Sequence, residues 1–297
     1  MDEDLGYGWQ GGLLDLPGYL ERVGYDGDLA PVEGTLRALH RAHVTSIPFE
    51  NLEIMLGRPV VVSLDAVQAK LVRRARGGYC FEHTRLFAAV LERLGFEVTA
   101  LAGRVTLGSA HVRPMTHALL HVRPPDRPRD EPAWLCDVGF GAGPLEPLRL
   151  VDGEEVVQDG WGFRLQRGRT VTTWSPHTAA WELHQAAGDG WLQRHTFTLN
   201  ETFRIDFDVL SHYVSTSPRS PFTTRPFAQK FTSDALRVLD GTTLTVTRPD
   251  GSSENRVLAP EELPGTLARD FGIVLEGEDV PRLIAFVREG RPVVREG

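Results

Sequence analysis

Cys80 directly follows a pair of glycines and directly precedes a stretch in which apolar residues recur at helical spacing. Amide groups at the N-terminus of a helix carry partial positive charge, which favours the thiolate form of a cysteine and can stabilise a developing oxyanion. Gly77 and Gly78 would let a substrate approach the backbone closely. In this context we predict that Cys80 is a nucleophile, although a cysteine without such a context is more often an ordinary buried residue.

A nucleophilic cysteine needs an imidazole beside it, and often a carboxylate that orients the imidazole. His117 is the best placed of the ten histidines, because it follows a loop and opens a short apolar strand. His83 lies three residues after Cys80 on the same predicted helix, where a bond between two such side chains is rare. We therefore interpret His117 as the base and His83 as a structural residue or a wall of the cleft.

Asp137 interrupts an apolar strand that ends in glycines. A carboxylate in apolar surroundings needs a partner, which favours a role in orienting the imidazole. The simpler interpretation is a turn residue at the end of a strand. Cys136, the next residue back, should point to the opposite face of the strand and belong to the core.

A metal site is the alternative use of the histidines. His117 and His121 are four residues apart, a spacing that binds zinc when both lie on a helix. Prolines on both sides leave too short a segment for that helix, and no glutamate follows His117. The chain has two cysteines and lacks the clustered spacing of a structural zinc site, so we expect neither a metal nor a disulfide framework.

A helix and two strands must position these residues. Helical spacing of apolar residues is found over 34–43 and 64–76, and again from Cys80 to a stop at Gly95. From about residue 97 the pattern changes to short strands between Gly- and Pro-rich turns, which indicates a β-barrel or sandwich. The expected strands are 97–105, 117–122, 133–138, 161–166 and 191–199.

The last part of the chain reads as a small α/β unit. An irregular stretch is expected over 200–225, followed by strands and then by helices. The strands are predicted at 242–248 and 253–258, and the helices near 261–270 and 280–288. The order α, then β, then α/β places Cys80 in the first part and the histidine and aspartate in the second.

Composition and charge narrow the range of partners. The chain has 297 residues, more than one core usually serves, with 41% hydrophobic and 24% charged residues. Its formal net charge of -8 disfavours broad binding to nucleic acid or to an anionic membrane. No apolar run is long enough to cross a bilayer, and the first four residues are acidic where a signal peptide would be basic. We expect a cytoplasmic protein with a small-molecule partner, and the sequence leaves open whether it is a homodimer.

Taken together, the motifs resemble the arylamine N-acetyltransferase family. The nucleophile motif reads Arg76-Gly77-Gly78-Tyr79-Cys80-Phe81-Glu82, the histidine motif Thr116-His117, and the acid motif Asp137-Val138-Gly139-Phe140-Gly141. Further similar blocks lie at 46–52 and 213–222, so the resemblance runs from about residue 18 to 275. Thr84 departs from the pattern, because the family commonly has Asn there, and the tail 288–297 has no counterpart and is expected to be mobile.

The resemblance implies an α+β multi-domain fold with a core like that of cysteine proteases and transglutaminases. The family's architecture corresponds to a helical domain over 1–96, a β-barrel over 97–205 and an α/β lid over 206–297. It implies acetyl transfer from acetyl-coenzyme A to an arylamine or arylhydrazine by a ping-pong mechanism, with no metal. Cys80, His117 and Asp137 would form the catalytic triad.

The resemblance also assigns binding residues. Thr116, Phe140 and Gly141 are expected near the thiol arm of coenzyme A. Phe49, Val105, Phe140 and Phe222 are expected to line the pocket for the acyl group and the amine. Each of these residues also has a simpler interpretation as a core or turn residue.

Three other functions remain open from the sequence. The same triad would serve an amide synthase that closes a macrolactam from a carrier-bound polyketide thioester. It would also serve a thiol hydrolase or transglutaminase-like enzyme, whose acceptor is water or lysine. The last alternative is a binding module without catalysis, which an intact triad disfavours.

Overall fold

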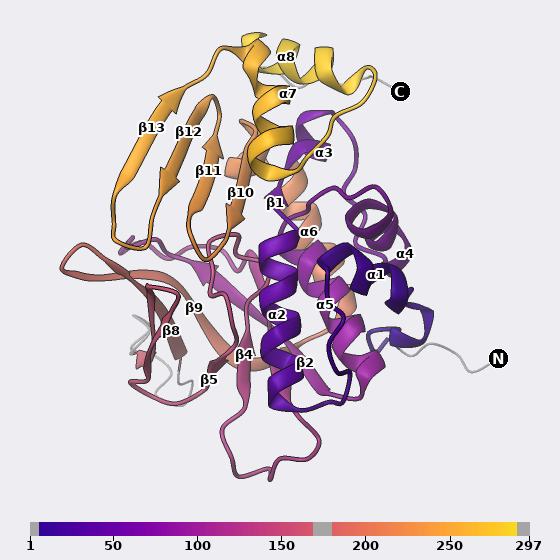
Figure 1. Cartoon of the computed structure of the whole chain (residues 1–297), viewed down its shortest axis with the longest axis vertical. Coiled ribbons are helices and arrows are strands. Elements are labelled where there is room, and N and C mark those ends of the chain that lie inside the picture. Colours follow the sequence, from indigo (N-terminus) through magenta and orange to yellow (C-terminus); the bar gives the residue numbers. More distant parts are fainter. Residues whose placement is uncertain (1–5, 169–179, 290–297) are drawn as a thin grey trace.

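A computed structural model describes residues 6–168 and 180–289 of the chain. Most of the helices precede the large sheet in the sequence, as expected (Figure 1). The helices of the described residues are α1 (Leu16–Val23), α2 (Glu33–Ser46), α3 (Leu52–Met55), α4 (Leu64–Val67), α5 (Cys80–Leu94), α6 (Arg204–Thr216), α7 (Leu263–Thr266) and α8 (Asp279–Glu289). Two of them continue with a wider turn, α4 into Gln68–Arg73 and α7 into Leu267–Phe271.

Helix α5 forms where the apolar spacing predicted it and begins at the cysteine. Residues 80–91 of this helix are all buried, so it is a core helix. Its first turn is stabilised by Glu82, whose carboxylate accepts a hydrogen bond of 3.0 Å from the backbone N–H of Tyr79. Gly95 ends the helix with a φ of 95°, a conformation that glycine adopts without strain.

Eight strands form an antiparallel sheet in the order β5-β4-β3-β2-β9-β8-β7-β6. Because β5 and β6 are the two ends of this order, the described strands form a curled half-barrel rather than a closed barrel. The half-barrel lies beside α2 and α5 (Figure 1). Its strands are β2 (Glu97–Val105), β3 (His117–Arg123), β4 (Trp134–Cys136), β5 (Leu148–Arg149), β6 (Glu155–Gln158), β7 (Trp161–Gly168), β8 (Ala180–Ala187) and β9 (Gly190–Thr202).

A second sheet, of five described strands, combines one strand from the helical region with four strands from residues 227–257. Its order is β1-β10-β11-β12-β13, and every neighbouring pair is antiparallel. The short strand β1 comes from the helical region, and α7 and α8 pack beside the rest of the sheet (Figure 1). The strands are β1 (Phe49–Glu50), β10 (Phe227–Phe231), β11 (Leu236–Asp240), β12 (Thr243–Thr247) and β13 (Ser253–Val257).

The prediction of an irregular stretch over 200–225 is wrong, because the helix α6 lies within it. The side chains of Phe207, Ser211 and Val214 are buried on one face of α6. The helix starts without a usual capping side chain at Phe203. Instead, the Phe203 N–H donates to the carboxylate of Asp206 at 2.8 Å.

Smaller differences from the expected elements concern their ends. The helix predicted over 64–76 ends at Arg73, where the chain turns with a φ of 51° at Ala75. The strand predicted over 133–138 ends at Cys136, so Asp137 is the first residue after β4. Strands β1, β5, β6, β8, β10 and β11 were not predicted. The domain boundaries at 96/97 and 205/206 stay predictions, and most of the tail 288–297 lies outside the described residues.

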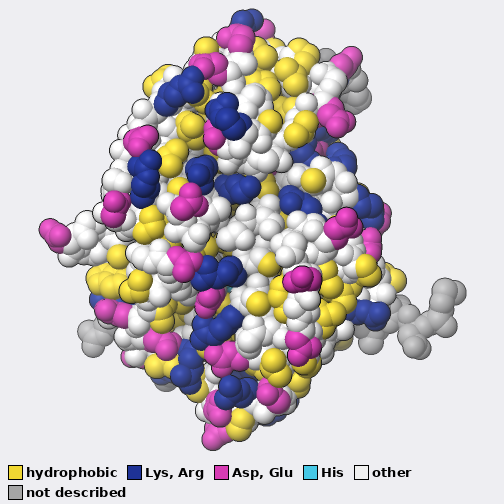
Figure 2. Space-filling model, viewed as in Figure 1, with side chains coloured by type: hydrophobic (Ala, Val, Ile, Leu, Met, Phe, Trp, Pro, Cys, Tyr) yellow, Lys and Arg dark blue, Asp and Glu magenta, His cyan; other side chains and the backbone are white. Residues whose placement is uncertain are grey.

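Two hydrophobic clusters hold the molecule together. The larger one joins the helices to the half-barrel and includes Phe81, Phe87 and Leu120. The smaller one lies under the five-stranded sheet and includes Leu239, Leu267 and Phe271. Basic and acidic side chains are interspersed over the face seen in Figure 2, which shows no broad area of one sign. None of the described helices is both long and apolar enough to cross a membrane.

Candidate active site

Cys80 is the first residue of α5 and is buried at the junction of the helix and the half-barrel. Its thiol lies 3.4 Å from the carbonyl oxygen of Thr116, directly before β3. The loop after β4 passes against it at Gly139, where a Cβ atom would lie 2.8 Å from the Cα of Cys80. Any larger residue at 139 would push this loop away, so the glycine sets the approach of the loop to the thiol.

His117 and Asp137 meet because their strands are neighbours. His117 is the first residue of β3, and Asp137 follows β4, which pairs with β3. The His117 Nε2 donates to Asp137 Oδ1 at 2.9 Å, and both side chains are buried. Since Nε2 is used in this bond, Nδ1 is the ring nitrogen left to interact with Cys80. The structure thus brings together the three residues singled out in the sequence.

A second histidine, His195 of β9, forms a hydrogen bond with the other oxygen of the Asp137 carboxylate. Its Nε2 donates to Asp137 Oδ2 at 2.8 Å, and the side chain is fully buried. Among the described residues, the other ring nitrogen, Nδ1, has no hydrogen-bond partner. His195 was not predicted as a site residue. It lies in a predicted strand, but nothing in its spacing relates it to a residue 58 positions away.

The two histidines differ in charge. Burial disfavours the cation of His117, but Asp137 and, to a smaller extent, Cys80 outweigh it and raise the pKa of His117 to about 10. Burial lowers the pKa of His195, although its bond to Asp137 opposes this. Burial alone would raise the pKa of Asp137, but charge and hydrogen bonds from the two histidines hold it well below its usual range. Near neutral pH the site therefore contains an imidazolium, a carboxylate and a neutral imidazole.

His40 of α2 holds the backbone of Asp137. The His40 Nδ1 donates to the carbonyl of Leu145 at 3.0 Å, so its Nε2 is the acceptor for the Asp137 N–H at 3.2 Å. This arrangement requires a neutral ring. Burial lowers the pKa of His40 to about 4, which keeps it neutral at physiological pH.

A chain of buried side chains supports the backbone just before Cys80. The hydroxyl of Tyr19 lies 3.1 Å from His43 Nδ1, and His43 Nε2 lies 2.9 Å from His83 Nδ1. The His83 Nε2 donates to the carbonyls of Gly78 and Pro48 at 3.1 and 3.2 Å. Carbonyls accept only, so every proton in the chain points in one direction, from Tyr19 towards Gly78. His83 is therefore a structural residue.

The buried histidines make the stability of the fold dependent on pH. Burial lowers the pKa of His40 and of His83 from 6.5 to about 4, so between these values the unfolded chain binds protons that the folded chain does not. We expect the free energy of unfolding to fall as the pH drops from 6.5 to 4, by up to about 3 kcal/mol for each residue. His117 has the opposite sign, because its raised pKa contributes stability that is lost as the pH rises towards 10.

Urea denaturation between pH 4 and pH 8 would measure this dependence. His83→Gln should flatten the acid limb of the curve. His111→Gln, which changes an exposed histidine, should leave it unchanged. A stability that is constant from pH 7 to pH 4 would contradict the assignment of neutral buried rings.

Thr84 shows what replaces the asparagine that is common in the family. Its hydroxyl donates to the carbonyl of Ala118 at 3.0 Å. This single bond connects α5 to β3 one residue after His117.

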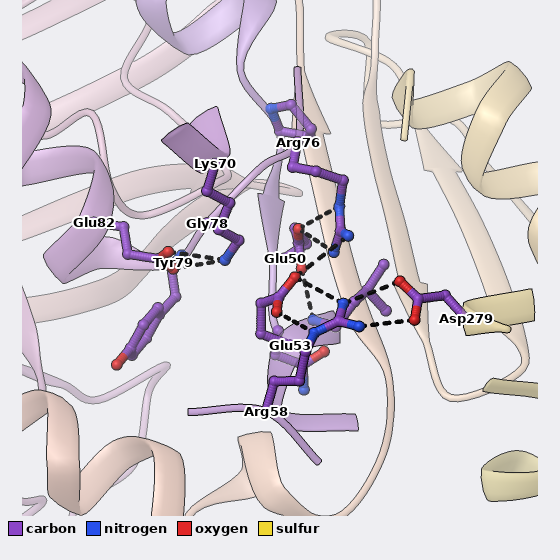
Figure 3. Close-up of polar contacts among 12 residues, drawn as sticks. Glu50, Glu53, Arg58, Lys70, Arg76, Gly78, Tyr79, Glu82 and Asp279 are labelled. Atoms are coloured by element: carbon purple, nitrogen blue, oxygen red, sulfur yellow. Dashed lines mark hydrogen bonds and ion pairs between the residues drawn. The ribbon is translucent and has the colours of Figure 1, made fainter. Parts of the chain in front are cut away.

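Two sets of buried ion pairs stabilise the segment before Cys80, as Figure 3 shows. Lys70 Nζ lies 2.8 Å from the carboxylate of Glu82, which also caps α5. Arg76 lies 2.8 Å from the carboxylate of Glu50 and 3.4 Å from that of Glu53. These ion pairs were not predicted, because each joins residues from separate elements.

The same network reaches the end of the chain. Arg58 pairs with Glu53 and also with Asp279, at 2.7 Å, in the first turn of α8 (Figure 3). An acid in the first turn of a helix is favoured by the helix dipole. The ion pairs thus link the loop after α3 with both the nucleophile segment and α8.

Breaking one buried pair should cost more than breaking a surface pair. Lys70→Met leaves Glu82 without its cation in a buried position, and we expect a loss of about 3–5 kcal/mol in the free energy of unfolding. Asp65→Asn is the matched control, because it breaks an exposed pair with Arg73 and should cost less than about 1 kcal/mol. Urea denaturation would compare them. The expectation fails if the two variants are equally stable.

The expected binding residues lie in two aromatic groups. The ring of Phe140 stands edge-on to His117, with centroids 5.2 Å apart. The ring of Phe49 lies 5.6 Å from that of Phe222. Gly141 connects the two groups, because a Cβ there would lie 2.8 Å from the Cβ of Phe49. Val105, at the end of β2, pairs with His195, and Thr116 lies against the thiol.

The group of His117, Asp137 and His195 also has the composition of a metal site. Their ligand atoms lie within 4.8 Å of one another. However, both carboxylate oxygens are already used in hydrogen bonds to the two Nε2 atoms. This pattern is that of a hydrogen-bonded site.

Comparisons with known proteins define the class. A family model described as N-acetyltransferase matches residues 34–280. An arylamine N-acetyltransferase from Mycolicibacterium smegmatis is 41% identical over 282 residues, which cover 92% of this chain and 98% of the relative. Human arylamine N-acetyltransferase 1 is 30% identical, with 91% and 97% of the two chains covered.

Solved structures agree with these matches. The crystal structure of the Nocardia farcinica arylamine N-acetyltransferase superposes with a TM-score of 0.89 at 52% identity and covers 96% of this chain and 98% of that one. The Mycobacterium marinum enzyme in complex with CoA superposes with a TM-score of 0.83 at 35% identity, with 93% and 99% covered. The chain therefore belongs to the arylamine N-acetyltransferase family, which confirms the resemblance found in the sequence.

Proposed function

We propose that this protein transfers an acetyl group from acetyl-coenzyme A to the nitrogen of an arylamine or arylhydrazine, through an acetyl thioester on Cys80. The observation that carries the proposal is the thiol at the start of α5 beside His117, whose imidazolium is held by Asp137. Membership of the family supplies the substrate class.

In the first half-reaction the Cys80 thiolate attacks the acetyl carbonyl carbon. The imidazolium of His117 stabilises the thiolate before attack and then donates its proton to the sulfur of coenzyme A as the carbon–sulfur bond of the donor breaks. The N-terminal end of α5 favours the negative charge that develops on the carbonyl oxygen. The products are acetyl-Cys80, neutral His117 and coenzyme A.

In the second half-reaction the neutral His117 accepts a proton from the amine as its nitrogen attacks the acetyl thioester. The bond between carbon and Cys80 sulfur breaks, which releases the amide and restores the thiolate and imidazolium. Asp137 stays ionised throughout, because its pKa lies far below neutral. It orients the ring and stabilises the charge on it.

The binding residues follow the aromatic groups around the thiol. We propose that Thr116, Phe140 and Gly141 contact the thiol arm of coenzyme A, and that Phe49, Val105, Phe140 and Phe222 line the pocket for the acyl group and the amine. The proximity of Phe140 to His117 and the packing of Phe49 on Phe222 support this. The proposed division is a helical domain over 1–96, a barrel-type domain over 97–205 and an α/β lid over 206–297.

Steady-state kinetics with acetyl-coenzyme A and a simple arylamine would test the mechanism. Parallel double-reciprocal lines and release of coenzyme A before any amine is added are expected. An enzyme that releases coenzyme A only when both substrates are present would overturn the scheme. Acetate released at the full rate without amine would favour a hydrolase, and inactivity with every simple arylamine would favour an amide synthase that needs a carrier-bound chain.

A further inference from the structure

Arg194 reaches the site because β9 has a bulge there. Strand β8 pairs with β9 through Leu183 and His195 and then through His184 and Gln193, which leaves Arg194 as the extra residue. In a regular strand, neighbouring side chains point to opposite faces, whereas a bulge re-aims one of them. Accordingly, Arg194 and His195, although consecutive, both contact the ring of Phe140.

The guanidinium of Arg194 lies close to the reacting groups. Its central carbon is 4.5 Å from the centroid of Phe140, and the centroid of the His117 ring is 5.2 Å from the same point. Because the two contacts share one ring, the guanidinium is within about 10 Å of the His117 imidazole. At this distance Arg194 can contact a substituent of the substrate whose reacting atom lies beside His117.

The positive charge of Arg194 has no counter-ion among residues 6–168 and 180–289. Its Nε atom is buried without a hydrogen-bond partner, although the residue as a whole is half-buried. The nearby acid, Asp137, already uses both carboxylate oxygens for His117 and His195. Burial lowers the pKa of Arg194 to about 10, so it remains a cation at neutral pH. A buried hydrogen-bond donor of a charged group is normally paired, since leaving it without an acceptor is costly.

Arg164 provides the contrast within the same sheet. Its guanidinium also lies over an aromatic ring, 4.6 Å from the centroid of Trp191. Its Nε is likewise buried without a hydrogen-bond partner among the described residues, but the guanidinium has a carboxylate partner, Glu155, at 3.5 Å. An arginine in this sheet can therefore stack on an aromatic ring and still pair with a carboxylate, so stacking alone does not explain why Arg194 has no ion pair. Two buried nitrogen atoms at the bulge, Arg194 Nε and His195 Nδ1, lack partners within the described part of the chain.

We propose that Arg194 is a specificity-determining residue that binds a carboxylate on the acceptor, so that the preferred substrates are arylamines with an acidic ring substituent. The inference rests on the proposed acetyl transfer. The reacting nitrogen must come within about 3–3.5 Å of the acyl carbon on Cys80. Because the guanidinium is within about 10 Å of the His117 ring, a carboxylate on the far side of the benzene ring from that nitrogen can reach Arg194. The phosphates of coenzyme A are attached beyond the long pantetheine arm, so they are less suited to this position.

The test compares 4-aminobenzoate with its neutral analogue 4-aminobenzamide, in the unmodified enzyme and in Arg194→Met. We expect Arg194→Met to lower kcat/KM for 4-aminobenzoate about 10- to 100-fold, mainly through KM, because a charge-assisted pair is lost. The value for 4-aminobenzamide should change less than about threefold, which is the scale of a surface change. Arg164→Met, the matched control, should leave both substrates unaffected. Equal losses for the two substrates would overturn the proposal.

Two further experiments distinguish an acceptor carboxylate from the other anions that Arg194 could bind. If Arg194→Met raises KM for acetyl-coenzyme A but not for the phosphate-free donor p-nitrophenyl acetate, the arginine binds coenzyme A phosphate and the proposal is wrong. If the variant changes transfer from malonyl-coenzyme A to aniline but leaves 4-aminobenzoate unaffected, the anion belongs to the acyl group and the proposal is again wrong.

A binding measurement keeps this inference separate from the proposed function. Benzoate should protect Cys80 from iodoacetamide in the unmodified enzyme more strongly than benzamide does, and Arg194→Met should abolish the difference. This protection needs no acetyl transfer. An enzyme that acetylates aniline but shows no benzoate protection refutes the role of Arg194 alone, whereas protection without any arylamine acetylation refutes the proposed function alone.

Discussion

Replacing Cys80 with alanine is expected to lower the rate of arylamine acetylation by about 10⁵-fold or more, because no other group can form the acyl intermediate. The fold should survive, since the change removes one sulfur atom from a buried position. Turnover with acetyl-coenzyme A, together with mass spectrometry of the protein after incubation with the donor alone, would measure the effect. The unmodified enzyme should gain one acetyl group, and Cys80→Ala should gain none.

Cys136→Ala is the matched control for the nucleophile. Cys136 is the other cysteine of the chain and is fully buried in β4, next to Asp137 in sequence. Burial raises its pKa well above the usual value, so it stays an unreactive thiol. The control should keep both the acetyl adduct and most of the activity. An acetyl group that is retained in Cys80→Ala and lost in Cys136→Ala would refute the assignment.

The second large effect is expected from Asp137→Asn. The substitution keeps the shape of the side chain but removes the charge that raises the pKa of His117 to about 10. With this charge gone, burial dominates and the ring loses its proton at neutral pH. We expect kcat/KM to fall by about 10³- to 10⁴-fold, the scale seen when the orienting acid of a serine protease triad is changed in this way.

The pH dependence of thiol alkylation distinguishes this cause from a general loss of structure. In the unmodified enzyme the imidazolium persists to about pH 10, so the rate of Cys80 alkylation by iodoacetamide should be nearly constant between pH 7 and pH 9. In Asp137→Asn the rate should be low at pH 7 and rise with pH. A rate profile identical to that of the unmodified enzyme would rule out charge stabilisation by Asp137.

The sequence was sufficient for the parts of the site that depend on local signals. The Gly-Gly-Tyr-Cys segment and the apolar spacing after it predicted a thiol at the start of α5, and the structure has it there. His117 was predicted to open one strand and Asp137 to interrupt another, and the pairing of β3 with β4 brings the two residues together. Short-range patterns of this kind carry the information because strand ends and helix starts are set within a few residues.

The groups that were missed make long-range contacts or break a pattern. His195 and His40 contact Asp137 across 58 and 97 residues, and no local signal reports such a contact. The bulge at Arg194 shifts the alternation of β9 by one residue, which reverses the expected face of its side chain. Helix α6 was overlooked because the exposed apolar residues Ile205 and Val209 blur its amphipathic spacing.

The position of the nucleophile segment depends in part on β10, which is synthesised long after it. The N–H of Gly78 donates to the carbonyl of Pro48, and the N–H of Glu50 donates back to Gly78. Pro48 directly precedes the two-residue strand β1, whose one partner among the described strands is β10, through pairs such as Phe49 with Gln229. A chain still being translated, with the cysteine, histidine and aspartate already made, would therefore hold an unfinished site. Acetylating capacity should appear late in synthesis, when the edge strand β1 finds its neighbour.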